Sequence, residues 1–442
     1  MLAKGLLAVF VLIGGGMEQF FIVGGNKLEG EVEVDCAKNS ILPIMACSIL
    51  IEGQVRIEKA VKYSDVLAMC KILEHIGAKT WWDKEDLLIE PSTLTGNDVP
   101  ECLADCVRAS IFCLGPILAR QKSVKIAYPG GCDIGLRPID IHLQGAKTLG
   151  AKIVEKNGYI YAGFDKMCPS DVFLPFPSVG ATENLMMLAL GIEGTTRLIG
   201  CAKEPEIIDL QNFINKAGGC VRGAGGDVIV IEGGKKLHSV SYKVMPDRIE
   251  AGTFLIAGAM CGGEICVKGA IEDHNRELLA KLTQSACNFK VENDNIILIR
   301  KEKLKSFGEI ETGPYPAFPT DLQSQMCALA CFCEGVNLIV ENVFESRNKH
   351  LLGLKKLGGD IISKNGVTII KGKEKLFGAS VSSTDLRGGA SLVLAGLASE
   401  GYTTVDNIHF IDRGYFKIED KITALGGMIK RIDIEKEGDY CF

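Results

Sequence analysis

A repeat of about seventy residues runs through most of this 442-residue chain. Six helical runs each end in a small-residue turn, and the key residues are Gly77, Gly150, Gly218, Ala286, Gly358 and Gly426. They follow one another at intervals of 73, 68, 68, 72 and 68 residues. This period is too long for a simple solenoid and suits a small βα supersecondary unit. The sequence therefore predicts a chain built from six copies of one unit.

A second marker, usually Glu-Gly, precedes a run of β-forming residues in each unit. The marker residues are Gly53, Gly194, Gly263, Gly335 and Gly401, with Gln121 at the equivalent place in the second unit. An apolar helix precedes each marker, and a strand, a loop, an amphipathic helix and two short strands follow it. The first helices are apolar all round, which predicts that they are buried. We expect an α/β fold whose six units group into two pseudo-symmetric domains.

Charge and length exclude two classes of partner. The chain carries 49 basic and 55 acidic side chains, a net charge of −6. Nucleic-acid binding proteins usually carry a basic surface, so no nucleic acid is expected as a partner. The apolar stretch near the N-terminus is about a dozen residues, shorter than the ~20 that span a bilayer. No membrane partner is expected either.

The seventeen cysteines are scattered, mostly within apolar runs, and no Cys-x-x-Cys pair occurs. No pair of histidines completes a zinc site. We therefore interpret nearly all of them as small buried residues in a reducing cytoplasm. Neither a metal nor a disulfide framework is predicted.

Charged side chains recur at two places in the repeat. The start of the buried helix, about fourteen residues before the marker, holds Lys38, Arg108, Arg248, Asp321 and Arg387, with Ser178 and Gly180 in the third unit. The strand-to-helix loop, twelve or thirteen residues after the marker, holds Asp65, Glu206, Arg276, Arg347 and Arg413. Helix N-termini also offer free N–H groups that favour anions. The repeat therefore predicts an anion-binding cleft rich in Arg and Lys.

The second unit has an extended loop at the later of these two places. Sixteen residues separate Gln121 from Arg137, and the extra length is the segment PGGCDIG, Pro129 to Gly135. Its three glycines predict a mobile loop that presents Cys132 to a ligand. A thiol beside Arg137 and other cations is expected to have a lowered pKa, which favours a reactive role.

These motifs resemble those of the UDP-N-acetylglucosamine enolpyruvyl transferases, sisters of the enolpyruvylshikimate-phosphate synthases. The resemblance runs from about Met17 to about Arg431. It rests on AKNS at Ala37, VRASI around Arg108, PGGCDIGLRPIDIHL at Pro129, PSVGATEN at Pro177, KEPEI at Lys203, PDRIEAGTF at Pro246, PAFPTDLQ at Pro316, TDLRGGASLVLAG at Thr384 and IDRGYFKIEDK at Ile411.

The resemblance implies two inside-out α/β-barrel-like domains, each made of three repeated βαβαββ units. Residues 17–37 together with 247–442 are expected to form one domain. Residues 38–246, which include the Cys132 loop, are expected to form the other. Because the resemblance begins at Met17, we expect residues 1–16 to be an extension that is not part of the native protein.

The implied reaction transfers the enolpyruvyl group of phosphoenolpyruvate to the 3′-hydroxyl of UDP-N-acetylglucosamine and releases phosphate, the first committed step of peptidoglycan synthesis. The resemblance implies Cys132 as general acid and fosfomycin target, Asp321 as general base, and Lys38 and Arg413 as further catalytic residues. The phosphoenolpyruvate site is implied to comprise Lys38, Asn39, Arg137, Arg347, Arg387 and Arg413. The UDP-N-acetylglucosamine site is implied to comprise Arg108, Arg137, Pro138, Ile139, Asp140, Ile141, Ser178, Val179, Gly180, Asp321 and Val343. No cofactor is implied, and the location is cytoplasmic.

Two alternatives remain open: a catalytically idle paralogue that binds a UDP-sugar, and a shikimate-pathway enolpyruvyl transferase. The sequence departs from the family pattern at Phe176, Asn348 and Gly388. None of the three replaces a side chain with an implied catalytic role, so these departures bear on substrate affinity.

Overall fold

The computed structural model describes residues 18–130, 135 and 138–433. The expected extension at residues 1–16 lies outside this range, as do Cys132 and Arg137. The described chain forms two compact units. Unit 2 takes in Val34–Ile249 and Gly313–Pro319, and unit 1 takes in the described residues of Met1–Glu33, Glu250–Thr312 and Thr320–Phe442.

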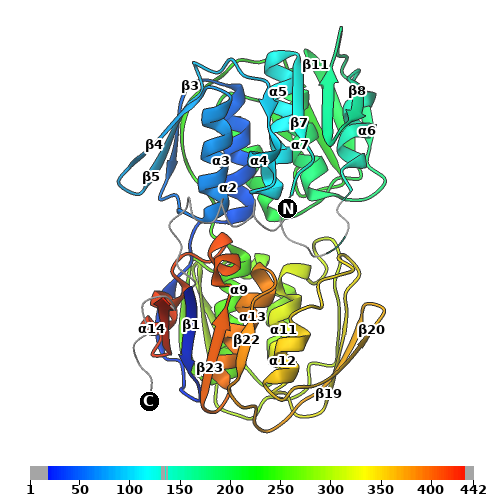
Figure 1. The fold of residues 1–442 in the computed structure, drawn as a ribbon. Helices are drawn as coiled ribbons and strands as arrows, with labels where there is room; N and C mark the ends of the chain where they lie inside the picture. The colour runs from blue at the N-terminus through cyan, green and yellow to red at the C-terminus, as the bar shows by residue number, and fades with distance from the viewer. Residues whose placement is uncertain (1–17, 131–134, 136–137, 434–442) are drawn as a thin grey trace. The chain divides into compact units, whose positions relative to one another are not determined.

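Six four-stranded sheets, three in each unit, confirm the predicted six-copy α/β fold (Figure 1). The sheet orders in unit 2 are β14-β3-β5-β4, β6-β7-β9-β8 and β10-β11-β13-β12. The strands are β3 (Ile51–Glu58), β4 (Lys79–Asp83), β5 (Asp86–Glu90), β6 (Asp98–Val99), β7 (Ser123–Ala127), β8 (Lys152–Lys156), β9 (Tyr159–Gly163), β10 (Asp171–Phe173), β11 (Gly194–Ile199), β12 (Val221–Arg222), β13 (Val228–Gly233) and β14 (Leu237–Lys243).

The sheet orders in unit 1 are β16-β17-β15-β2, β18-β19-β21-β20 and β22-β23-β1-β24. The strands are β1 (Glu18–Val23), β2 (Gly30–Glu33), β15 (Gly263–Lys268), β16 (Asn288–Glu292), β17 (Asn295–Arg300), β18 (Glu309–Glu311), β19 (Val336–Val340), β20 (Asp360–Lys364), β21 (Val367–Lys371), β22 (Ser380–Ser382), β23 (Tyr402–Asp406) and β24 (Met428–Asp433). In every sheet one outer pair of strands is parallel and the other neighbours are antiparallel. The parallel pair comes first in five of these orders, and in β16-β17-β15-β2 it is the last pair, β15 with β2.

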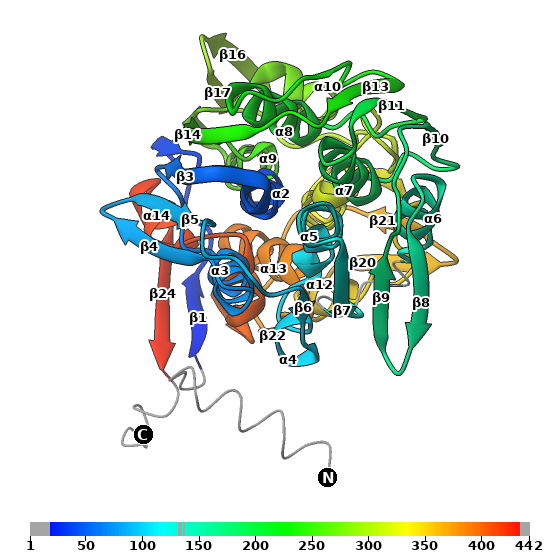
Figure 2. The same ribbon diagram turned by 90° about the horizontal axis from the view of Figure 1, so that it is seen from above.

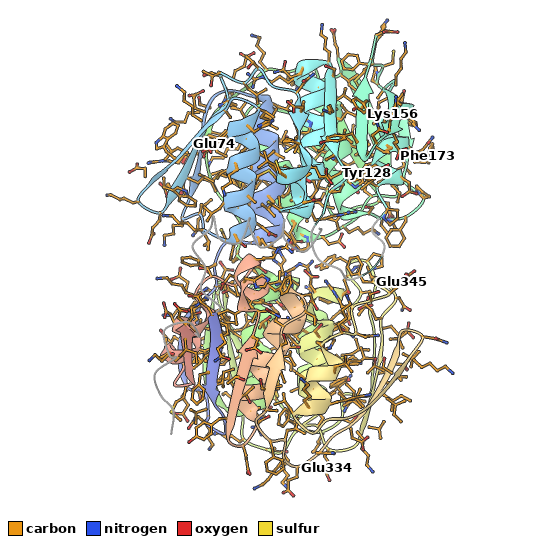
Figure 3. The ribbon with its side chains drawn as sticks, viewed as in Figure 1. Glu74, Tyr128, Lys156, Phe173, Glu334 and Glu345 are labelled. Carbon is orange, nitrogen blue, oxygen red and sulfur yellow. The ribbon has the colours of Figure 1, made fainter. Side chains whose placement is uncertain are left out.

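One apolar helix from each repeat lies inside the unit to which it belongs. Figure 2 shows α2, α5 and α7 gathered inward of the sheets of unit 2. All ten residues from Ala181 to Leu190 in α7 are buried, which confirms the prediction of buried first helices. Charged side chains such as Glu74, Lys156 and Glu334 point outward instead (Figure 3).

The helices of unit 2 are α2 (Lys38–Cys47), η1 (Ser48–Leu50), α3 (Ser64–His75), α4 (Glu101–Ala104), η2 (Arg108–Cys113), α5 (Leu114–Gln121), α6 (Asp140–Thr148), α7 (Val179–Leu190) and α8 (Pro205–Lys216). Unit 1 contains α9 (Arg248–Cys261, whose first two residues belong to unit 2), η3 (Glu272–His274), α10 (Arg276–Gln284), η4 (Thr320–Leu322), α11 (Gln323–Ala330), α12 (Leu351–Lys356), α13 (Leu386–Ala398), η5 (Ile408–Arg413) and α14 (Ile418–Ala424). Among the described helices, none combines the length and apolar composition that a membrane span requires.

The residues that mark the repeat adopt left-handed backbone conformations. Gly77 has a φ of 101° and Gly358 a φ of 105°, and Ala286, the one alanine in this set, has a φ of 68°. At the second marker the assignment of Gln121 is wrong, because Gln121 ends α5 and Lys122 has the left-handed φ of 62°. No glycine stands at this position, so the sequence offered no Glu-Gly signal. The corrected distance from the marker to Arg137 is fifteen residues.

Strand β1 closes the last sheet of unit 1. It pairs antiparallel with β23, where Phe20 lies opposite Val405, and with β24, where Phe20 lies opposite Arg431. In each of the other five sheets the corresponding place, beside the inner strand of the parallel pair, is filled by the later strand of a hairpin from the same repeat. Phe20 and Ile22 are fully buried in the core of unit 1. The sixth repeat is therefore assembled from segments near both ends of the described chain.

Candidate functional site

The residues predicted at helix starts lie where the repeat places them. Lys38, Arg108 and Arg248 are the first residues of α2, η2 and α9. Ser178 is the N-cap of α7, and its hydroxyl oxygen accepts a hydrogen bond from Ala181 N at 3.3 Å. Asp321 lies in η4, directly before α11. The first-turn N–H groups of these helices therefore lie close to the side chains of interest.

The residues predicted on the strand-to-helix loops, twelve or thirteen residues after the marker, are only partly in loops. Arg347 precedes α12, and Arg413 ends η5. Asp65, Glu206 and Arg276 instead lie in the first turns of α3, α8 and α10, so their predicted loop placement is wrong. These helices begin earlier than expected, and in α8 Pro205 occupies the first turn, where its fixed φ favours helix initiation.

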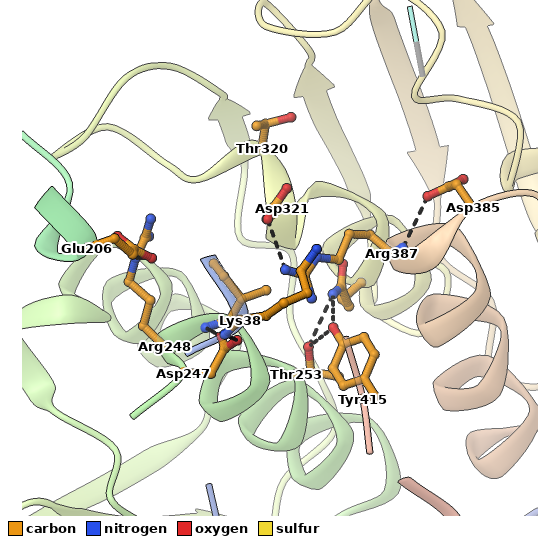
Figure 4. Close-up of polar contacts among 12 residues, drawn as sticks. Lys38, Glu206, Asp247, Arg248, Thr253, Thr320, Asp321, Asp385, Arg387 and Tyr415 are labelled. Carbon is orange, nitrogen blue, oxygen red and sulfur yellow. Dashed lines mark hydrogen bonds and ion pairs between the residues drawn. The ribbon is translucent and has the colours of Figure 1, made fainter. Parts of the chain in front are cut away.

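In unit 2, Lys38 is held at both its side chain and its backbone. Its Nζ lies 3.2 Å from Asp65 Oδ2, and the side chains are 12% and 4% exposed. Its backbone N donates to Asp247 Oδ2 at 3.1 Å. Figure 4 shows Lys38 beside Asp247. The ammonium group is thereby positioned, with Asn39 following it in the first turn of α2.

Arg248 forms a second buried ion pair in unit 2. Its Nε donates to Glu206 Oε1 at 3.0 Å and to Oε2 at 3.3 Å. The guanidinium carbon lies 5.7 Å from the centre of the Tyr315 ring. The Glu206 carboxylate therefore neutralises a cation that the sequence placed in an anion site.

Three of the segments implied for nucleotide binding are connected through His142 on α6. A Cβ atom on Gly180 would lie 3.2 Å from His142 Cε1, a tight contact, so the start of α7 packs closely against the His142 ring. Burial, with a smaller contribution from Arg108, lowers the pKa of His142 to about 3. Arg108 itself donates from Nη1 to Pro129 O at 3.0 Å. The structure thus joins Arg108, the start of α6 and the start of α7.

The remaining residues implied for the nucleotide lie on these same segments. Pro138 is exposed and Ile139 is buried, and both precede α6. Asp140 begins α6 and Ile141 follows it. Val179 is the first residue of α7 and is half-buried.

In unit 1, Asp321 is held between two arginines. Its Oδ1 lies 2.8 Å from Arg347 Nη2, and its Oδ2 lies 3.0 Å from Arg387 Nη2. Both arginine side chains are buried, whereas 23% of the Asp321 side chain is exposed. Figure 4 shows Asp321 and Arg387 in this cluster. The carboxylate is therefore the solvent-facing member of a fixed triad.

A second carboxylate, that of Glu341, is linked to this triad through the hydroxyl of Thr320. Glu341 Oε2 accepts a hydrogen bond from Thr320 Oγ1 at 2.8 Å, and Arg347 Nη1 donates to the same hydroxyl at 2.8 Å. Glu341 Oε1 also accepts from the backbone N of Val343 at 2.8 Å. The N–H of Val343, a residue implied for nucleotide binding, is thus already used within the protein.

Two departures from the family pattern and the Arg413 segment also lie in unit 1. A Cβ atom on Gly388 would lie 2.6 Å from Asp385 Oδ2, so a larger residue at this position would displace the carboxylate that caps α13. Asn348 Oδ1 accepts from Gln323 Nε2 at 3.2 Å. Arg413 is half-buried, and the adjacent Asp412 is paired with Arg431 at 2.7 Å. The third departure, Phe176, is 48% exposed in unit 2.

The cations predicted to line an anion site are held by carboxylates. Within the described residues, Lys38, Arg248, Arg347 and Arg387 each form an ion pair with an acidic side chain. The sequence did not identify the supporting roles of Asp247 and Glu341. Opposite charges 27 residues apart at Lys38 and Asp65, and 26 apart at Asp321 and Arg347, were a readable signal for the pairing.

The cysteines of the described chain include eight that are buried. The prediction that nearly all are buried is wrong for Cys102, Cys106 and Cys168, which are exposed. Exposure follows from their places in α4, in the turn after it and before β10, and not in the inner helices. No group of three or more metal-ligating side chains occurs among the residues that the structure describes.

Comparison with known proteins identifies the family. The profile of EPSP synthase (3-phosphoshikimate 1-carboxyvinyltransferase) matches residues 22–422. UDP-N-acetylglucosamine 1-carboxyvinyltransferase 2 of Caldanaerobacter subterraneus subsp. tengcongensis is 45% identical over 94% of this chain and 100% of its own length. UDP-N-acetylglucosamine 1-carboxyvinyltransferase 1 of Symbiobacterium thermophilum is 44% identical over 94% of this chain and 95% of its own length.

Solved structures agree on the fold. The enolpyruvyl transferase NikO from Streptomyces tendae matches with a TM-score of 0.84 and 23% identity, covering 94% of this chain and 99% of that one. An EPSP synthase from Acinetobacter baumannii matches with a TM-score of 0.71 and 20% identity, covering 94% and 100%. Because the family profile spans most of the chain and the curated relatives are more than 40% identical, the chain belongs to the EPSP synthase family of carboxyvinyl (enolpyruvyl) transferases and is an enzyme of that class.

Proposed function

We propose that this enzyme transfers the enolpyruvyl group of phosphoenolpyruvate to the 3′-hydroxyl of UDP-N-acetylglucosamine and releases phosphate. Five relatives that are 43–45% identical over at least 93% of the chain carry the name UDP-N-acetylglucosamine 1-carboxyvinyltransferase. The observation in the structure that best supports the proposal is Asp321 held between Arg347 and Arg387. This arrangement combines a partly exposed base with two fixed oxyanion-binding groups.

We assign Asp321 as the general base that takes the proton from the sugar hydroxyl as its oxygen attacks C2 of phosphoenolpyruvate. Arg347, Arg387 and Arg413 are assigned to the phosphate and carboxylate, because the planar guanidinium binds an oxyanion through two parallel N–H groups. The carboxylate of Asp321 keeps two of these arginines in place before substrate binds. Such preorganisation lowers the reorganisation cost of the reaction.

Residues of unit 2 complete the proposed assignment. Cys132 donates a proton to C3 while C2 is attacked, which gives a tetrahedral intermediate with a methyl group. Loss of a proton from that methyl group and departure of phosphate then restore the enol. Lys38, Asn39 and Arg137 are assigned to phosphoenolpyruvate, and the segments joined by His142 are assigned to the nucleotide sugar. The mechanism requires no metal or cofactor.

The proposal includes the biological setting that this reaction implies. The product is a peptidoglycan precursor, so the enzyme would serve cell wall biogenesis, cell shape and division in the cytoplasm. The shikimate-pathway alternative shares the family profile, yet the matched EPSP synthase structures are only 19–20% identical. The idle-paralogue alternative predicts binding of the UDP-sugar without turnover.

Phosphate release distinguishes the three functions. We expect the purified enzyme to release phosphate from phosphoenolpyruvate with UDP-N-acetylglucosamine and not with shikimate 3-phosphate. Arg413→Ala tests whether turnover depends on the assigned oxyanion-binding side chain and not on stability, because this side chain is half-buried and its loss should not alter the core. It should abolish turnover and leave the melting temperature near that of the wild type. Turnover only with shikimate 3-phosphate, or with neither acceptor, would contradict the proposal.

A further inference from the structure

We infer that Tyr415 is a positioning residue that fixes two of the proposed oxyanion-binding arginines, Arg387 by direct contact and Arg413 through the chain. The inference rests on the proposed function and adds a role for a side chain that has no substrate contact in the assignment above. Tyr415 lies between η5 and α14 and is fully buried.

The ring of Tyr415 forms one wall of the Arg387 pocket. The guanidinium carbon of Arg387 lies 5.4 Å from the centre of the ring, within the range of a cation–π interaction. The tip of the same guanidinium is held by Asp321 at 3.0 Å. Two contacts of different kinds, one with the face of the group and one at its edge, therefore define the plane of Arg387 (Figure 4).

The hydroxyl group of Tyr415 fixes the position of the ring. Its oxygen lies 2.8 Å from Thr253 Oγ1 and 3.1 Å from Gln325 Nε2. Gln325 Nε2 also lies 3.1 Å from Thr253 Oγ1, so the three groups form a closed triangle. Thr253 and Gln325 are buried on α9 and α11, the inner helices of two other repeats. A buried tyrosine hydroxyl needs such partners, and here they anchor the ring to both helices.

The backbone of Tyr415 restrains Arg413, which precedes it by two residues. Tyr415 N donates to Ile411 O at 3.0 Å, and Gly414 N donates to the same oxygen at 3.1 Å. These backbone bonds tie the end of η5 to Tyr415, whose side chain is fully buried. Because Arg413 itself is half-buried at this end, the position of its Cα depends on how Tyr415 is seated.

Two substitutions separate the contributions of the ring and the hydroxyl. Tyr415→Phe keeps the aromatic face, and the bond between Thr253 and Gln325 remains available, so kcat/KM for phosphoenolpyruvate should fall by no more than about threefold. Tyr415→Leu removes the face and should lower this ratio by about tenfold or more. The KM for UDP-N-acetylglucosamine should stay within about twofold in both variants, since Arg387 and Arg413 are assigned to phosphoenolpyruvate.

Phe254→Leu is the matched control for lost packing. Phe254 is fully buried in unit 1 and follows Thr253 on α9, so its loss perturbs the same core. We expect Phe254→Leu to lower the melting temperature about as much as Tyr415→Leu while kcat/KM for phosphoenolpyruvate stays near the wild-type value. An equal kinetic loss in both variants, or wild-type kinetics in Tyr415→Leu, would overturn the positioning role.

A binding measurement keeps this inference distinct from the proposed reaction. Saturating phosphoenolpyruvate should raise the melting temperature of the wild type and of Phe254→Leu, and this rise should be mostly lost in Tyr415→Leu. If the wild type binds phosphoenolpyruvate without turnover, the proposed function fails. The positioning role is then decided by whether Tyr415→Leu loses the rise in melting temperature that the wild type shows. If the wild type does not respond to phosphoenolpyruvate, both are overturned.

Discussion

Asp321 neutralises Arg347 and Arg387 while it remains partly exposed, at 23% of its side chain. One residue thus orders two cations and presents the carboxylate that we propose as the base. This double role explains why two arginines can be buried in unit 1 without the cost of an uncompensated charge. It also predicts that removing the charge of Asp321 will affect more than proton transfer.

Asp321→Asn should lower kcat by about 10²–10⁴-fold, the usual contribution of a general base. The amide keeps the size of the side chain but cannot pair ionically with both arginines, so the melting temperature should also fall. Isothermal titration calorimetry should still detect UDP-N-acetylglucosamine. A variant that turns over at the wild-type rate would exclude Asp321 as the base.

Fosfomycin, an epoxide that resembles phosphoenolpyruvate, should alkylate Cys132 and do so faster when UDP-N-acetylglucosamine is bound. The three exposed cysteines of the described chain, Cys102, Cys106 and Cys168, serve as internal controls because simple accessibility would label them as well. Cys132→Asp should remain active and escape the drug. Peptide mass spectrometry locates the adduct, and an adduct on a control cysteine would refute the assignment.

The individual site residues could be predicted from the sequence better than their partners could. Lys38 and Asp321 were placed at helix starts by the repeat alone, and the structure has them there. Asp247, which accepts from the backbone N of Lys38, and Glu341, which accepts from Thr320 next to Asp321, lie outside the two repeat positions, and their contacts depend on packing between separate segments. Tyr415 had no polar signal of its own, because its role arises from contacts with three separate segments of the chain.

At the scale of helices and strands, the turn that ends each amphipathic helix is the element most strongly set by local chemistry. A left-handed conformation costs an ordinary residue roughly 1–2 kcal/mol, and glycine avoids this cost. Ala286 adopts a φ of 68° at the place where Gly358 adopts 105° in the next repeat. Ala286 and Gly358 therefore allow two opposite substitutions at equivalent positions, alanine to glycine in one repeat and glycine to alanine in the next.

Ala286→Gly should stabilise the protein by about 0.5–1 kcal/mol, because the relief of backbone strain exceeds the added entropy of the unfolded chain. Gly358→Ala is the reciprocal test and should destabilise by about 1–2 kcal/mol. Its new Cβ would meet only Leu376 Cδ2 at 3.6 Å, an ordinary contact, so steric overlap does not confuse the result. Urea unfolding measures both changes, and equal signs would contradict the argument.

The elements were predictable where a glycine marked them and less so elsewhere. Five of the second markers are glycines with positive φ, and the sixth was misassigned by one residue because Lys122 adopts that conformation without a glycine. The sheets were also only partly predictable. Repetition indicated six units, but no local pattern indicates that β1 pairs with β23 and β24.

For the whole molecule, each unit contains a buried histidine with a depressed pKa. Burial lowers the pKa of His142 in unit 2 to about 3 and that of His350 in unit 1 to about 4. Their neutral forms are favoured in the folded state, whereas an unfolded histidine takes up a proton near pH 6.5. Both therefore contribute stability that is complete above about pH 6.5 and is lost as the pH falls toward their folded pKa values.

The free energy of unfolding should fall by about 1.4 kcal/mol per pH unit for each of these histidines below about pH 6. Buried carboxyl groups such as Glu183, whose pKa is raised by burial, act in the opposite direction, so the test compares variants. His142→Gln and His350→Gln should each flatten the decline between pH 6 and pH 5 in urea unfolding. Slopes equal to that of the wild type would contradict the prediction.

The closure of the last sheet by β1 sets an order of events during translation. Phe20 leaves the ribosome long before its partners Val405 and Arg431, by roughly 20–80 s at about 5–20 residues per second. Most of unit 2 is synthesised within that interval and can fold, and β2 can pair as soon as β15 emerges. Throughout this time the apolar segment Phe20–Val23 has no sheet to join, which makes it a natural chaperone target. Protease treatment of ribosomes stalled near residue 340 should therefore cut β1 while it spares unit 2, and resistance at β1 should appear only once β24 has emerged.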